Sequence, residues 1–128
     1  MALTLSAVTF DPTVTSTWMA KGVTDATTAA AQNVYCGFTP RRIEVLNLTD
    51  QITDFYTPAM AAGVSRHCLA NGTWTDAVAN GFTLLTGTEI PPASTLIALG
   101  TNGTGGQGFT IGTAPLVASK TYQITAWK

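Results

Sequence analysis

Charged residues are scarce in this sequence. Asp, Glu, Lys and Arg make up 10% of the 128 residues, against about 25% in typical soluble chains. The net charge is −1, and the one adjacent basic pair is Arg41-Arg42. Nucleic-acid binding needs several phosphate contacts from a clustered basic patch, so we expect no nucleic acid as a partner. A nearly neutral surface is poor at keeping a lone monomer in solution, and this favours contact with other protein.

Long hydrophobic runs and targeting signals are also missing. No apolar stretch approaches the ~18 residues that a membrane-spanning helix needs, so we expect no membrane segment. The first ten residues, MALTLSAVTF, lack the charged start and the longer apolar core of a secretory signal. We therefore expect the chain to stay in the compartment where it is made.

Residues that commonly carry chemistry are few. Cys36 and Cys68 show no metal-binding spacing, and we expect two small reduced thiols, although the sequence leaves a disulfide between them open. The single histidine, His67, directly precedes Cys68, so the two point to opposite faces of a strand. We expect His67 at the surface or rim of the fold. Asp50 and Asp54 flank a turn, where we expect solvated acids, with a calcium site as the alternative.

The glycine-rich stretch GTNGTGGQG, residues 100–108, lacks the Lys and Ser/Thr of a phosphate-binding loop. No helical pattern follows it to supply a positively polarised N-terminus, so we interpret it as a connector. The spacing of the acids does not indicate a carboxylate pair either. From these absences we predict no enzymatic activity and no cofactor.

The residues that are abundant favour strands. Threonine is the commonest residue, at 24 positions, and its branched Cβ suits the pleated surface of a sheet. Short apolar or alternating segments recur about every ten residues, with Gly, Pro and Asn turns between them. This pattern predicts an all-β fold, an antiparallel β-sandwich or a jelly-roll-like barrel. The segments include residues 2–10, 41–48, 52–60, 64–70, 73–78, 82–86, 95–99, 109–113 and 121–127.

Several of these segments carry more specific expectations. Asn71-Gly72 is the strongest hairpin turn signal, joining residues 64–70 to residues 73–78. Residues 41–48 have apolar side chains on both faces, which predicts a central strand covered on both sides. Residues 109–113 and 121–127 are expected to close the chain as a last pair of strands.

The domain organisation is expected to be simple. Residues 1–33 are expected to form an N-terminal strand and an extended arm, and residues 34–128 the β-sandwich body of a single domain. In the last strand, the residues on the face of Tyr122 are apolar, whereas Trp127 falls on the face with the threonines. We therefore expect Trp127 at a sheet edge, under a loop or against a neighbouring subunit.

The ending GFTIGTAPLVASKTYQITAWK, residues 108–128, resembles the ends of short bacteriophage structural proteins. Those proteins close with a Gly-Phe-x-Ile-Gly run, a short loop, a Lys-Thr-Tyr triplet and a final alternating strand with Ala and an aromatic. Residues 37–49, GFTPRRIEVLNLT, are similar to a strand in such proteins that follows a Pro and ends near an Asn. The matching residues at the end are Gly108, Phe109, Ile111, Gly112, Lys120, Thr121, Tyr122, Ala126 and Trp127.

The resemblance covers residues 37–128 and implies a virion structural protein, most like a capsid decoration, or cement, protein. It implies a small β domain made in the host cytoplasm and placed on the capsid surface. Its partner would be the major capsid protein. Together with the low charge, the resemblance favours a homo-oligomer, a trimer or a dimer.

Six residues are candidates for protein contact. For Phe10, Trp18 and Met19, a place in the core of the sandwich is the alternative. Two other functions stay open: a tail- or fibre-associated module that binds a host glycan through Trp74, and a small β-barrel ligand-binding protein or enzyme with a polar pocket. The candidate contact residues are Phe10, Trp18, Met19, Arg41, Arg42 and Trp127.

Overall fold

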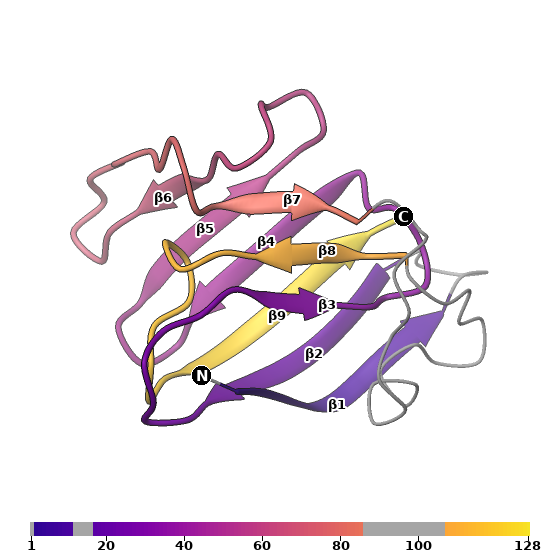
Figure 1. Ribbon diagram of the computed structural model, residues 1–128, viewed down its shortest axis with the longest axis horizontal. Coiled ribbons are helices and arrows are strands. Elements are labelled where there is room, and N and C mark those ends of the chain that lie inside the picture. Colours follow the sequence, from indigo (N-terminus) through magenta and orange to yellow (C-terminus); the bar gives the residue numbers. More distant parts are fainter. Residues whose placement is uncertain (1, 12–16, 86–106) are drawn as a thin grey trace.

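A computed structural model of the chain describes residues 2–11, 17–85 and 107–128, apart from the side chains of Phe10 and Asp11 (Figure 1). In these ranges the chain is all-β, and no helix there is long and apolar enough to cross a membrane. The strands are β1 (Leu3–Asp11), β2 (Thr17–Thr24), β3 (Gln32–Val34), β4 (Arg42–Asn47), β5 (Ile52–Tyr56), β6 (Arg66–Cys68), β7 (Phe82–Leu84), β8 (Phe109–Ile111) and β9 (Thr121–Trp127).

The strands form two open antiparallel sheets. The large sheet has six strands in the order β1-β2-β9-β4-β5-β6, and the small sheet has three in the order β3-β8-β7. Figure 1 shows the small sheet lying over the middle of the large one. The prediction of an all-β antiparallel sandwich is therefore confirmed, and the barrel alternative is wrong because neither sheet closes on itself.

The core lies between the sheets and follows from strand periodicity. Alternate residues of a strand point to opposite faces, so one set from each strand meets the facing sheet. In β9 this set is the apolar one that the sequence predicted, and Tyr122, Ile124 and Ala126 are all fully buried. The largest fully buried side chains are Trp18, Tyr122, Phe82, Phe109, Ile43, Ile111, Leu116, Ile124, Val34, Val45 and Asp54.

The predicted extended arm is wrong for the described part of residues 1–33. β2 pairs with β9 from Thr17–Trp127 to Val23–Thr121, and β1 then pairs with β2. Trp18 is fully buried and belongs to the core, which was the alternative for it. The periodicity was hard to recognise because small or polar residues, Ala20, Gly22 and Thr24, hold the other buried positions of β2.

Three further expectations need correction. β8 and β9 are not partners, because β8 lies between β3 and β7 in the small sheet. β4 is central in its sheet, as expected, but one of its faces is not covered, since Arg42, Glu44 and Leu46 remain partly exposed. The Asn71-Gly72 turn is present, but its return segment makes only isolated bridges. The expected strand 95–99 and most of the connector 100–108 lie outside the described residues.

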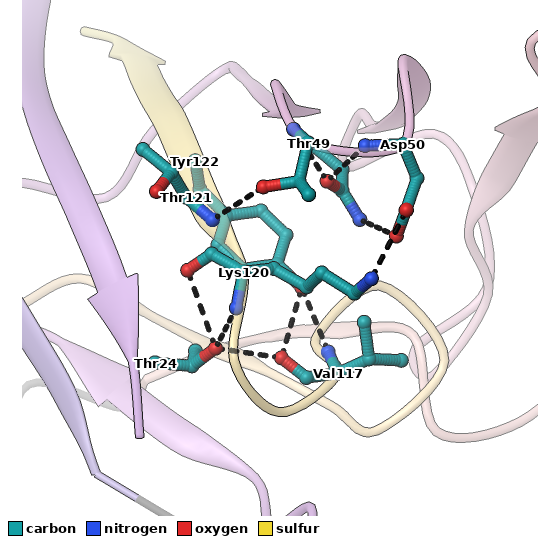
Figure 2. Close-up of polar contacts among 8 residues, drawn as sticks. Thr24, Thr49, Asp50, Val117, Lys120, Thr121 and Tyr122 are labelled. Atoms are coloured by element: carbon teal, nitrogen blue, oxygen red, sulfur yellow. Dashed lines mark hydrogen bonds and ion pairs between the residues drawn. The ribbon is translucent and has the colours of Figure 1, made fainter. Parts of the chain in front are cut away.

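A polar network holds the start of β9 in place (Figure 2). The Tyr122 hydroxyl accepts a hydrogen bond from the Val117 N–H at 2.8 Å and donates one to the Val117 carbonyl at 3.1 Å. Thr24 Oγ1 donates to the same carbonyl at 2.7 Å and accepts from the Lys120 N–H at 3.0 Å. Lys120 Nζ lies 3.0 Å from Asp50 Oδ1. The network therefore joins the loop before β9 to β2 and to the β4–β5 turn, which fixes the strand that carries Trp127.

Candidate functional site

The face of the large sheet that points away from the small sheet is here called the outer face. It carries the residues that alternate with the buried set, and most of them are partly or fully exposed. Since strands hold side chains at fixed positions, this face presents its groups on a rigid support. Its members are Met19, Lys21 and Val23 of β2, Gln123, Thr125 and Trp127 of β9, Arg42, Glu44 and Leu46 of β4, Thr53 and Phe55 of β5, and Arg66 and Cys68 of β6.

Two arginines and three aromatic rings form a continuous row across one end of the outer face. Arg42 is paired with Trp127 in register, and its Cζ lies 5.7 Å from the Trp127 ring centre and 4.7 Å from that of Phe55. Phe55 meets the Trp74 ring edge to face at 5.8 Å. Arg66 Cζ lies 4.9 Å from the Trp74 ring centre. We call these five residues the arginine–aromatic ladder.

The ladder is nearly neutral in charge. Arg42 Nη2 lies 3.5 Å from Glu44 Oε2, and Arg66 Nε lies 2.9 Å from Asp76 Oδ1. Both arginine side chains are about two-fifths exposed, so each ion pair adds little stability. Each cation–π contact at such a site contributes roughly 0.5–1 kcal/mol. These contacts hold the three rings and the two guanidinium groups against one another, and all five side chains remain at least partly exposed.

A separate apolar hollow is lined partly by side chains of the same face. Its volume is about 390 Å³, and it is lined mainly by the side chains of Met19 and Leu48 and by the β1 residues Ala7 and Thr9. Lys21 and Gln123 supply its polar groups. Leu48 is 52% exposed, so the hollow is open to an incoming apolar side chain.

The structure brings half of the predicted contact residues together. Met19, Arg42 and Trp127 all lie on the outer face, as candidates for contact require. Trp18 does not, because it is buried in the core. Phe10 pairs with Trp18 through the backbone, and its side chain lies outside the described residues.

Arg41 lies just before β4 and has a local role. Its N–H donates to the Trp127 carbonyl at 2.7 Å, and its Nε donates to the Lys128 carbonyl at 2.6 Å. Arg41 therefore fixes the end of β9 next to the ladder rather than joining the ladder itself.

Sequence reasoning missed Phe55 and Arg66 and assigned Trp74 only to a glycan site. One signal was available for Phe55, because the adjacent aromatics Phe55 and Tyr56 must point to opposite faces of a strand. Tyr56 is buried, so Phe55 is the outward one. For Arg66 no sequence signal exists, because its place in the ladder follows from the pairing of β5 with β6.

A second polar cluster lies at the large sheet beside β6. Asp54 Oδ1 accepts hydrogen bonds from Ser65 Oγ and from His67 Nδ1, both at 2.7 Å. The Asp54 side chain is almost fully buried, and this burial raises the pKa of its carboxyl. In a nucleophilic triad the histidine lies between serine and acid. Here the acid lies between Ser65 and His67, so the cluster has a different order and fixes β6 to β5.

Two expectations from the sequence can be compared with the structure around this cluster. His67 is not simply a rim residue, because its side chain is mostly buried and bonded to Asp54. The expectation of two solvated turn acids is wrong for Asp54, whose side chain is buried in β5, whereas Asp50 is partly exposed at the turn and contacts Lys120 and Asn47. Among the described residues, no three His, Cys, Asp or Glu side chains are grouped as metal ligands.

The two cysteines are free thiols. Cys36 is buried in the core, and burial raises the pKa of its thiol to about 12. Cys68 is partly exposed on the outer face, in β6. The open question of a Cys36–Cys68 disulfide is thus settled in favour of two separate thiols.

A smaller hollow of about 260 Å³ lies over the small sheet. Glycines and threonines line most of it, including Gly63, Gly81, Thr83 and Thr110. Its polar side chains are uncharged, because they come from Asn80 and from threonines, and no charged side chain contributes to the lining.

No family model, curated protein or solved structure matches this chain.

Proposed function

We propose that this chain is a structural protein of a bacteriophage particle that decorates the capsid. It binds the outside of the shell through the outer face of the large sheet and has no catalytic role. The observation that carries the proposal is the arginine–aromatic ladder, in which the exposed Trp74 and four partly exposed residues form one row, namely Trp127, Arg42, Phe55 and Arg66. Tryptophan and arginine are the residues most enriched where protein interfaces gain their binding energy.

The rest of the outer face supports the same proposal. The apolar hollow with Met19 and Leu48 offers a place for an apolar anchor from the partner. Lys21 and Gln123 add polar groups to the lining of the hollow, which matches the mixed composition of protein interfaces. The sequence resemblance at residues 37–49 and 108–128 supplies the setting, a phage particle.

In a decoration protein, the role of the outer face is to stabilise the shell. A shell filled with DNA is under internal pressure, and a protein that binds only the expanded shell stabilises that form by mass action. The gain grows with the number of bound copies, so modest affinity per copy is sufficient. A small, rigid, low-charge domain suits this repeated use.

One observation favours a second candidate, a tail or fibre module that binds a host glycan. Trp74 is 47% exposed and lies close to the Asn71-Gly72 turn, where a sugar ring could stack on it. However, the guanidinium of Arg66 already lies over the Trp74 ring. We therefore favour protein as the partner, and the two candidates differ in copy number.

Quantitative mass spectrometry of the purified particle tests the proposal. Decoration requires a copy number comparable with that of the main shell protein. A copy number far below this value would support the tail or fibre candidate. Absence of the chain from the particle would contradict both.

A further inference from the structure

Among the described strands, β1 has a long outer edge that differs from the other edges of the two sheets. β1 (Leu3–Asp11) is the outermost strand of the large sheet, and no described segment pairs with its outer side. From Leu3 to Phe10 it contains no charged residue and no proline. Unpaired N–H and C=O groups on such an edge are a template for another strand.

The other sheet edges are protected. β6 is bordered by its return segment through the bridges Ser65–Ala77 and Cys68–Trp74. β7 is bordered by residues 63 and 64, because Gly63 N–H bonds to the Phe82 carbonyl and Phe82 N–H bonds to the Val64 carbonyl. β3 has only three residues. Natural sheets use short edges and such cover to prevent pairing, whereas β1 is long and no segment among the described residues covers its outer edge.

β1 has one irregularity, a bulge. The register with β2 shifts between Ser6 and Thr9, and Ala7 has a positive φ of 51°. A bulge twists an edge away from a neighbour, which limits further pairing there. Leu3–Ser6, which lies before the bulge, keeps regular register with β2 and is the part available to a partner.

The side chains of β1 that face the core are also only partly covered. Leu3, Leu5 and Val8 pack against the core but remain only partly buried. Leu3 and Leu5 lie over Gly22 of β2, where an added Cβ would come within 2.9 Å and 3.7 Å of their methyl groups. Figure 1 shows β1 beyond the outline of the small sheet, which explains why these side chains are half covered.

We propose that a second copy of this chain pairs with β1 through Leu3–Ser6, antiparallel and about a two-fold axis. The two large sheets then continue into one, and the leucines of both copies cover each other. The neutral sequence argues for self-pairing, because identical strands laid antiparallel meet no like charges. This inference does not depend on capsid binding, since it concerns the protein alone.

Analytical ultracentrifugation of the isolated full chain tests the pairing. The wild type is expected to form a dimer at micromolar concentration. The variant Thr4→Lys/Ser6→Lys places charges on exposed side chains of β1, so the fold is retained while like charges meet across the axis. Its dimer affinity is expected to fall roughly 100-fold or more.

Val23→Lys is the matched control. Val23 is 41% exposed and lies directly across from Thr4, but on β2, one strand further from the partner. It adds charge to the same face without touching the new strand, so it should still form the dimer. A wild type that stays monomeric, or a dimer equally strong in the Thr4→Lys/Ser6→Lys variant, would overturn the proposal.

Hydrogen exchange gives an independent reading. In the dimer, outward amides of Leu3–Ser6 should be protected more strongly as protein concentration rises. Protection that does not change with concentration would mean that the chain covers its own edge, and it would contradict the second copy as the occupant.

Discussion

Single residues separate two environments in this protein, a dry core and an exposed outer face. Trp18 and Met19 are neighbours in β2, yet Trp18 is fully buried and Met19 is 37% exposed. Arg42 is stacked between Phe55 and Trp127 on the outer face, while the next residue, Ile43, is fully buried. The ladder and the core thus come from alternate positions of the same strands.

The Cys36 thiol is expected to be unreactive in the folded protein. Its pKa of about 12 means that almost no thiolate exists at pH 8, and its side chain is buried. With a chromogenic disulfide reagent, one thiol, that of the partly exposed Cys68, should react in the native state. The second should react only after unfolding in denaturant. Rapid reaction of two thiols in the native protein would contradict the burial of Cys36.

Asp54 should make stability fall as pH rises through its titration. Burial raises its pKa above the ordinary 3.8, so the folded state holds the proton more tightly than the unfolded state. The stability that this proton brings is complete below pH 3.8 and is lost as pH rises through the higher folded pKa. Asp54→Asn keeps an Oδ1 acceptor for Ser65 and His67 but carries no charge.

Urea unfolding of the wild type and of Asp54→Asn between pH 3 and 7 measures this effect. The free energy of unfolding of the variant, relative to the wild type, should increase with pH across the titration and then level off. The difference between the two proteins removes the contributions of the other acids. A relative stability that decreases with pH would show that the charged Asp54 stabilises the fold.

At the level of elements, the polar network before β9 fixes the strand that pairs with both β2 and β4. Tyr122→Phe removes the hydroxyl that bonds both polar groups of Val117. The partly buried Val117 N–H then loses its partner, so we expect a loss of about 1 kcal/mol in the free energy of unfolding. Thermal or urea unfolding measures it.

Tyr35→Phe serves as the control for this change. Tyr35 is also buried, but its hydroxyl accepts only one bond, at 3.2 Å, from the exposed Asn33. Tyr35→Phe should therefore lower the free energy of unfolding by less than Tyr122→Phe does. Equal losses would mean that the network does not fix β9.

The hairpin of β1 and β2 is expected to be essential to the fold rather than an appendage. Trp18→Ala should cost about 3–5 kcal/mol because it empties a buried site. Met19→Ala, one residue along, should change the free energy of unfolding by less than about 1 kcal/mol. Circular dichroism with urea unfolding compares them. If Trp18→Ala and Met19→Ala both changed the free energy of unfolding only slightly, β2 would behave as a separate arm.

These elements also show what the sequence allowed one to predict. β9 was correctly assigned because apolar and polar residues alternate strictly from Tyr122 to Ala126. β2 was not, because Ala20 and Thr24 occupy buried positions with a weak apolar signal. Arg42 and Trp127 were named as contacts, but the ladder was not, since it forms across four strands and a bridge whose order appears only in the folded sheet.

At the level of the whole molecule, the protein is a two-sheet domain whose large sheet has one covered face and one available face. The small sheet covers the middle of the large sheet on one side. The other side carries the ladder and the apolar hollow. The edge at β1 adds a place for a second copy, so shell binding and self-pairing use different surfaces.

Trp74 is the best residue for testing shell binding. It contacts Phe55 and Arg66 on the surface and is not part of the core, so Trp74→Ala should change the free energy of unfolding by less than about 1 kcal/mol. Its loss should weaken binding to the shell by about 2 kcal/mol or more if the ladder is the contact. Val78→Ala is the control, since Val78 is 84% exposed and lies outside the ladder.

The most direct measurement is cosedimentation of the purified chain with expanded shells that have been stripped of it. We predict saturable binding by the wild type and by Val78→Ala, with Trp74→Ala at least about thirtyfold weaker. No binding by the folded wild type, or equal binding by Trp74→Ala, would contradict a capsid decoration protein that binds through its outer face.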